Sequence, residues 1–263
     1  MLTVSVFGQS HSVSRSSKTK TSGTSVKSKS NTNVPSKQQI INKLISNMVY
    51  VPYGTFTMGA TGEQGYDANN DEKPLHYVTL SNYFIGRFEV TQEEWEAVMG
   101  SNPSEFKGPK HPVENVSWED CQEFIRRLNN ITGKHFRLPT ESEWEYAARG
   151  GRSGGHKYAN SNEINSVGWY IGNSKKTTHA VGQKRPNDLG LYDMSGNVWE
   201  WCGDWYGNYY SSEQRDPKGP NSSSDRVIRG GSWCSDASDC RISKRCSFLP
   251  TSQDIDLGFR LAL

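Results

Sequence analysis

The chain has 263 residues and a formal net charge of +2, so it is long enough to bury a core as one large or two small domains. No apolar run approaches the roughly 18 residues of a membrane helix, and five cysteines are too few for a disulfide scaffold. The first residues also lack the charge order of a classical signal peptide. We therefore expect a cytoplasmic protein, or one that reaches a virion or cell surface by a nonclassical route.

The N-terminal segment is basic and poor in apolar residues. The first acid is Glu63, and seven bases precede it: Arg15, Lys18, Lys20, Lys27, Lys29, Lys37 and Lys43. A Ser/Thr/Lys-rich stretch of this kind buries too little apolar surface to fold. We therefore predict a disordered arm and linker over 1–47, with one short helix over 38–47 as the alternative for its end. Only the charge of this arm would attract nucleic acid, because no aromatic residue is interleaved between His11 and Lys37.

Alternating apolar and polar residues predict strands from residue 48 onward. The stretch "MVYVPYGTFTMG" (48–59) indicates a strand pair broken at Pro52-Tyr53-Gly54. Further strands are predicted at 76–80, 83–89, 198–202, 226–230 and 258–262.

Three helices share one start signal, a small hydroxyl residue followed three positions later by an acid. The pairs are Thr91 with Glu94, Ser117 with Asp120, and Thr140 with Glu143. They predict helices over 91–99, 117–130 and 140–148, with Gly100, Gly133 and Gly150 at or just past the ends. Beyond Gly150 the chain is rich in Gly, Asn, Ser and Trp and shows no βαβ alternation, so the expected class is α+β and loop-rich.

Seven segments occur in an order typical of one family. They are "MVYVPYGTFTMG", "FEVTQEEWEAVMG", "HPVENVSWEDCQEFIRRLN", "FRLPTESEWEYAARGG", "NDLGLYDMSGNVWEWCGDWYG", "RVIRGGSW" and "LGFRLAL". The chain thereby resembles the formylglycine-generating enzyme (sulfatase-modifying factor) domain over 48–263. The resemblance implies the C-type-lectin-like fold of that family.

The resemblance also implies a structural calcium ion in "DMSGNVWEW". Side-chain oxygens of Asp193 and Glu200 and carbonyl oxygens of Gly196 and Val198 match the family's ligand positions. Calcium favours such mixtures of carboxylates and backbone carbonyls. The alternative is a structural turn whose acids pair with arginine or with the backbone.

Active family members resemble one another in a C-terminal Gly-Gly-Ser-(Trp/Tyr)-x-Cys-x4-Cys motif, in which two thiolates bind copper(I). In "RGGSWCSDASDC", Cys240 and Ser232 match, but the first cysteine is Cys234, one residue early. On an extended segment this shift turns the side chain to the opposite face, so Cys234 is expected to point away from Cys240. The alternative function is a copper-dependent formylglycine-generating oxidase that acts on a cysteine of a sulfatase-type substrate.

The C-terminal segment also resembles the variable region of a protein diversified by a retroelement, which substitutes adenines in a terminal repeat. Residues typical of the family alternate here with three atypical triplets, at 234–236, 246–248 and 254–256. Randomised Asn codons permit every residue in them, as well as Ser238 and Asp239. The predicted binding patch comprises Cys234, Ser235, Asp236, Ser238, Asp239, Cys246, Ser247, Phe248, Asp254, Ile255 and Asp256.

Loops on a rigid scaffold tolerate variation and carry binding. The sequence therefore favours a noncatalytic binding or display protein whose partner is a protein or a cell-surface ligand such as a glycan. The copper enzyme and a degenerate structural homologue stay as alternatives. The ligand and the oligomeric state are not indicated.

Overall fold

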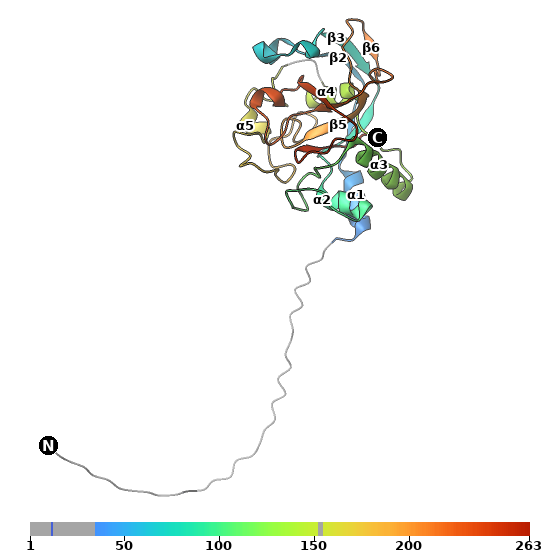
Figure 1. Ribbon diagram of the computed structural model, residues 1–263, viewed down its shortest axis with the longest axis vertical. Coiled ribbons are helices and arrows are strands. Elements are labelled where there is room, and N and C mark those ends of the chain that lie inside the picture. The colour runs from blue at the N-terminus through green and yellow to red at the C-terminus, as the bar shows by residue number, and fades with distance from the viewer. Residues whose placement is uncertain (1–11, 13–34, 152–154) are drawn as a thin grey trace, which may run out of the picture. The chain divides into compact units, whose positions relative to one another are not determined.

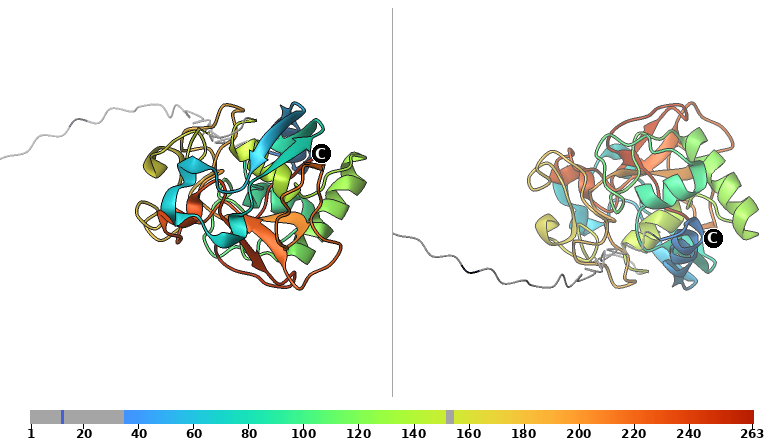
Figure 2. Two further views of the ribbon diagram at one scale, coloured as in Figure 1. Left: turned by 90° about the horizontal axis from the view of Figure 1, so that it is seen from above. Right: turned by 90° about the horizontal axis from the view of Figure 1, so that it is seen from below.

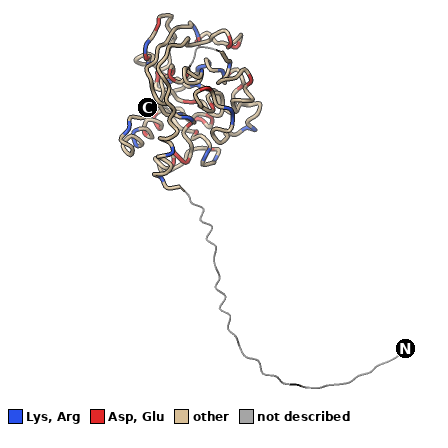
Figure 3. The backbone as a smooth tube through the Cα atoms, turned by 180° about the vertical axis from the view of Figure 1, so that it is seen from behind, with Lys and Arg blue, Asp and Glu red and all other residues tan. Residues whose placement is uncertain are grey.

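The computed structural model describes residue 12 and residues 35–151 and 155–263. The arm predicted over 1–47 lies outside the described residues up to position 34, and one compact unit extends from Pro35 to Leu263. No helix among the described residues is both long and apolar enough to cross a bilayer. Acidic and basic positions are interleaved over this unit (Figure 3).

The helices are α1 (Lys37–Ser46), α2 (Gln92–Met99), α3 (Trp118–Thr132), α4 (Glu141–Ala148) and α5 (Ile164–Val167), with 3-10 turns η1 (Gly62–Asp67), η2 (Asn70–Glu72) and η3 (Ala237–Cys240) (Figure 1). The strands are β1 (Met48–Val51), β2 (Gly54–Met58), β3 (His76–Leu80), β4 (Tyr83–Gly86), β5 (Trp199–Trp205), β6 (Gln214–Arg215), β7 (Arg226–Arg229), β8 (Arg245–Phe248) and β9 (Leu257–Gly258). The α+β class with long loops is therefore confirmed.

The predicted helix starts are confirmed by their caps. Thr91, Ser117 and Thr140 each accept a hydrogen bond from the backbone N–H three residues on, and each acid of the pair reaches back to the cap. Gly100 and Gly133 end their helices in the left-handed conformation that favours glycine. The sequence shows no helix beyond Gly150, yet α5 and η3 form there as short turns within loops.

The strands form three sheets, in the orders β1-β4, β2-β3-β6 and β8-β7-β5-β9. The prediction that 48–59 forms a strand pair is wrong in one respect: β1 pairs with β4 and β2 pairs with β3. The two strands pair with later segments because the break at Pro52-Tyr53-Gly54 sends them into different sheets.

The N-terminal boundary of the folded unit lies earlier than the expected residue 48. Helix α1 is capped by Ser36, and its Ile41 and Leu44 are 3% and 5% exposed. Both side chains lie in the core cluster that contains Trp95 of α2, and α1 and α2 lie side by side (Figure 1). Apolar burial therefore makes the short helix part of the domain rather than a linker.

Helix α4 lies between the two larger sheets and contacts β2, β3, β5 and β7. All eight of its residues are buried, including Glu141, Glu143 and Glu145. Buried carboxylates need partners, and arginines supply them. Arg149 donates to Glu145 at 2.8 Å, Arg245 donates to Glu141 at 2.6 Å, and Arg229 also pairs with Glu145.

Candidate functional site

The turn after β7 and the residue before β9 meet through hydrogen bonds. Ser232 Oγ donates to Asp256 Oδ2 at 2.6 Å, and Cys234 Sγ donates to the same oxygen at 3.1 Å. Ser235 Oγ lies 2.9 Å from Ser232 Oγ. Ser232 is fully buried, whereas Cys234 is exposed. The segments that hold the first and third triplets, 234–236 and 254–256, are therefore joined at Ser232.

An aromatic and apolar rim surrounds this contact. The Trp233 ring packs edge-on against Phe106 with centroids 5.1 Å apart, and its Nε1 donates to the Ile255 carbonyl at 3.2 Å. The Ile171 backbone N–H donates to the Ser235 carbonyl. Ile171 and Ile255 expose their side chains. The site thus combines small polar groups with exposed apolar ones, a composition suited to recognition.

The two candidate copper ligands lie in different surroundings. The Cys240 side chain is fully buried in a small cluster with Tyr158, Ile164 and Val167. Cys234 instead contacts Asp256 and Ser232 at the surface. The five cysteines are free thiols, and the described residues contain no group of three or more His, Cys, Asp or Glu placed to hold a metal.

Both thiols are held in the protonated form. Partial burial and, after it, the neighbouring Asp256 carboxylate together raise the pKa of Cys234 to about 11. Burial also raises the pKa of Cys240, with a contribution from Asp239. Without a bound metal, both cysteines are therefore thiols at neutral pH.

The sheet order separates the second triplet from the other two. Cys246, Ser247 and Phe248 lie on β8, one outer strand of the sheet, whereas Asp254, Ile255 and Asp256 precede β9, the opposite outer strand. Cys246 packs against the core, while Phe248 is partly exposed. Figure 2 shows the loop after β8 running beside the green helix α3, where the Pro250 carbonyl accepts from the Glu119 N–H.

The remaining predicted binding residues lie on the turn that carries η3. Asp236 is exposed, and Asp239 forms a 3.1 Å ion pair with Lys244. The Ser238 carbonyl accepts from Arg241 Nε at 2.8 Å. This turn therefore extends the patch away from Asp256, with its side chains partly committed to local contacts.

The sequence alone did not reveal the buried residues that hold the predicted binding segments in place. Arg241 is buried and forms a bidentate pair with Glu72 at 2.6 and 2.7 Å, and Arg245 forms another with Glu141. Their sequence signal is the run "RISKR" between triplets of small polar residues. The acidic partners lie more than a hundred positions away. The sequence therefore marks the two arginines but not the acids with which they pair.

The expected calcium ligands are partly engaged by the protein. Both Glu200 oxygens accept from Arg260 at 2.6 Å, and Trp144 Nε1 also donates to Glu200. Asp193 Oδ2 accepts from the Gly182 N–H, but Asp193 Oδ1 is buried with no hydrogen-bond partner among the described residues. Burial raises the pKa of Asp193 to about 6.

A third buried carboxylate lies against the same turn. Glu89 accepts from the Val198 N–H and from Asn197 Nδ2, and it had no signal in the sequence. Burial raises the pKa of Glu89, and the charges of Asp193 and Glu200 raise it further. Both Glu200 oxygens are thus bonded to Arg260, as expected for the alternative of a structural turn, whereas Asp193 keeps one buried oxygen without a hydrogen-bond partner among the described residues. The carbonyls of Gly196 and Val198 belong to the same turn.

Comparison with known proteins identifies the scaffold. The model of the sulfatase-modifying factor enzyme 1-like domain matches residues 33–263. A chaperone protein LppX from Paenibacillus barcinonensis is 33% identical over 82% of this chain and 88% of its own. A formylglycine-generating enzyme from Streptomyces coelicolor is 33% identical over 81% of this chain and 88% of its own.

A solved structure shows the same fold. Treponema denticola variable protein 1 is 36% identical, covers 82% of this chain and 94% of its own, and superposes with a TM-score of 0.75. The expected C-type-lectin-like fold of the formylglycine-generating type is thereby confirmed. Relatives that share this scaffold have names that indicate different functions. The function of this chain must therefore be argued from its site. The chain belongs to the family of sulfatase-modifying factor enzyme 1-like domains.

Proposed function

We propose that this protein is a noncatalytic binding protein whose C-terminal surface is diversified by a retroelement and contacts a protein or cell-surface ligand. The observation that carries the proposal is the contact of Ser232 and Cys234 with Asp256. It brings two of the three variable triplets together at the surface, beside Trp233 and Ile255.

Two further observations support this proposal. The variable segments are interleaved with buried, paired arginines at 241 and 245. Substitution between such anchors leaves the scaffold intact, as a diversified surface requires. A relative named as a variable protein has the same fold.

A pair of libraries tests the binding surface. One randomises 234–236, 254 and 255, and the matched control randomises the exposed residues 211–213. We expect both libraries to stay folded and only the first to yield specific binders when selected against a panel of cell-surface proteins. Loss of folding in the first library, or equal yields from both, would contradict the proposal. A reverse transcriptase gene beside a near-identical repeat of the 3′ end would support diversification by a retroelement. A locus that lacks both would contradict diversification but not binding.

The copper oxidase is the second candidate, because Ser232 and Cys240 occupy the family's positions and a formylglycine-generating enzyme is 33% identical. A competition titration with copper(I) tests it, together with oxidation of a Cys-x-Pro-x-Arg peptide. We expect no stoichiometric tight binding and no turnover. Copper binding that is lost in both Cys234→Ala and Cys240→Ala, with turnover in the parent, would establish the enzyme instead.

We propose calcium as a structural ion held by Asp193, Glu200 and the carbonyls of Gly196 and Val198. The orphaned Asp193 oxygen supports it. Thermal unfolding in calcium against magnesium should show a higher midpoint in calcium, and Asp193→Asn should abolish the difference. Equal midpoints in both salts for the parent protein would contradict a calcium site.

A further inference from the structure

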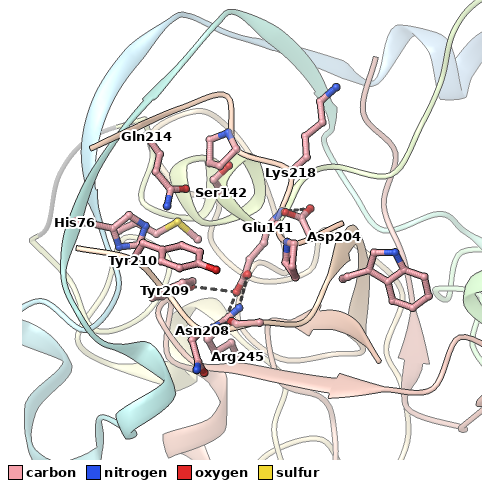
Figure 4. A pocket seen from close by; sticks show the side chains of 16 residues that line it. His76, Glu141, Ser142, Asp204, Asn208, Tyr209, Tyr210, Gln214, Lys218 and Arg245 are labelled. Atoms are coloured by element: carbon pink, nitrogen blue, oxygen red, sulfur yellow. Dashed lines mark hydrogen bonds and ion pairs between the residues drawn. The ribbon is translucent and has the colours of Figure 1, made fainter. Parts of the chain in front are cut away.

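Two adjoining cavities lie apart from the predicted binding patch. One has a volume of about 280 Å³ and the other about 470 Å³, and both are lined by Asp204 and Lys218. The smaller one lies beneath the loop that follows β5 and reaches the first turn of α4 (Figure 4). None of the eleven predicted binding residues lines either cavity. The volume of the smaller cavity lies just below the roughly 300–1,000 Å³ typical of small-molecule sites, and that of the larger one lies within this range.

The floor of the smaller cavity carries little net charge. Glu141 and Arg245 form a bidentate pair, and Tyr209 OH donates to Glu141 at 3.1 Å. Asp204 accepts from the Glu141 N–H at 2.9 Å, and burial raises its pKa to about 8. At neutral pH its carboxyl is therefore mostly uncharged, and the floor offers no strong site for an ion.

The wall and rim carry polar groups that the protein does not use. The side chains of Asn208, Tyr210 and Gln214 have no hydrogen bond within the described part of the chain. His76 uses Nδ1 toward the Pro74 carbonyl and keeps Nε2 available. Figure 4 places His76, Tyr210 and Gln214 around one side of the cavity. A purely apolar ligand would desolvate these groups without replacing their hydrogen bonds.

Aromatic rings stand beside these polar groups. Tyr210 is 65% exposed at the rim, and Tyr209 and Trp205 line the wall. Amide, imidazole and carboxyl groups beside the exposed Tyr210 ring suit a ligand with many hydroxyls on one edge and a C–H face on the other. Each ligand hydroxyl can donate and accept, so it can match Asn208, Gln214 and Asp204 alike.

We propose that this cavity binds a neutral saccharide through Asn208, Gln214 and the Tyr210 ring. The Tyr210 ring packs on the C–H face of the sugar, while the two amides and the Asp204 carboxyl bond its hydroxyls. The site is separate from the variable patch, so the binding of a sugar here would not change with the triplets.

Saturation-transfer NMR on the full chain tests this site with the methyl glycosides of glucose, galactose and mannose at about 10 mM, a concentration suited to weak single-ring ligands. We expect transfer to at least one of them. Tyr210→Ala and Gln214→Ala should each weaken binding at least about tenfold. Tyr53→Ala is the matched control, because Tyr53 is 77% exposed outside the cavity lining, and it should bind as the parent does.

Unfolding midpoints of all three variants should match that of the parent, since each altered side chain has no described hydrogen bond. Failure of all three glycosides to bind would overturn the proposal, and so would binding unaffected by either cavity variant. Binding of glucuronic acid or of a short peptide in place of the neutral sugars would also overturn it. If no partner binding depended on the three triplets while a sugar still bound in the cavity, only the proposed function would be refuted.

Discussion

The Ser232 hydroxyl donates to Asp256 Oδ2 at 2.6 Å and thereby ties the turn after β7 to the entry of β9. Ser232 is fully buried, so its hydroxyl has no water to replace this acceptor. Cys234 shares the same oxygen at 3.1 Å. One carboxylate of the predicted binding patch thus bonds both a buried residue and an exposed residue.

A double-mutant cycle measures this tie. Ser232→Ala and Asp256→Ala should each destabilise the protein, and the pair should show a coupling of about 1–3 kcal/mol in urea unfolding, as expected for a hydrogen bond to a charged group. The control Asp236→Ala, at an exposed position, should change stability by less than about 0.5 kcal/mol. Additive effects of the two substitutions would mean that the bond contributes nothing in solution.

Thiol labelling distinguishes the cysteines. Cys234 should be alkylated slowly at neutral pH, and the rate should rise about tenfold per pH unit toward its pKa of about 11, because only the thiolate reacts. Asp256→Asn should speed the reaction by removing the neighbouring negative charge. The buried thiols of Cys121, Cys202 and Cys240 should react only on unfolding. Mass spectrometry of labelled peptides gives the rates, and rapid labelling of Cys240 in the native protein would contradict its burial.

Substitution of a buried arginine should lower the free energy of unfolding more than substitution of a charged residue in a partly exposed ion pair nearby. Arg241→Ala leaves Glu72 buried without its cation and should cost about 3–5 kcal/mol. Lys244→Ala removes a partly exposed pair with Asp239 and should cost less than about 1 kcal/mol. Urea unfolding of both variants gives the comparison. Similar losses would show that the Arg241 pair is not a buried anchor.

The buried carboxyl of Asp204 should make stability fall as pH rises. Its folded pKa of about 8 exceeds the value of about 3.9 in the unfolded chain, so the native state binds the extra proton between these values. Stability from this group is therefore greatest at low pH and declines until about pH 8. Asp204→Asn keeps an oxygen for the Glu141 N–H and should flatten this part of the profile. Equal pH slopes for parent and variant between pH 5 and 8 would refute the shifted pKa.

Local signals in the sequence predicted the parts of the fold that depend on local contacts. The pair Thr140 and Glu143 marked the start of α4, because both members of a capping box lie within one turn. The pairing of β1 with β4 was not predictable in this way, since a strand's partner depends on which distant segment completes its sheet.

The candidate site was predictable to a similar extent. The triplets marked Cys234 and Asp256 as one class of position, but their contact depends on how β7 and β9 are placed in the sheet. The pairing of Arg245 with Glu141, 104 positions apart, has no sequence pattern at all. The offset of Cys234 from the family's first copper position was readable by counting alone; in the structure Cys240 is fully buried, whereas Cys234 is exposed and contacts Ser232 and Asp256.

If the surface is diversified as proposed, the buried arginines within and just after the triplet region also constrain the gene. Mutagenesis directed at adenines would strike any arginine codon that contains one, yet arginine also has codons without adenine. Arg241, Arg245 and Arg260 are all buried and paired, so we expect CGC, CGG or CGT at these positions. Every isoleucine codon begins with adenine, so the codon of Ile242 is open to substitution. A change of that first base yields Val, Leu or Phe. Each of these is apolar, as a side chain only 1% exposed requires, so even a struck codon there would keep the core filled.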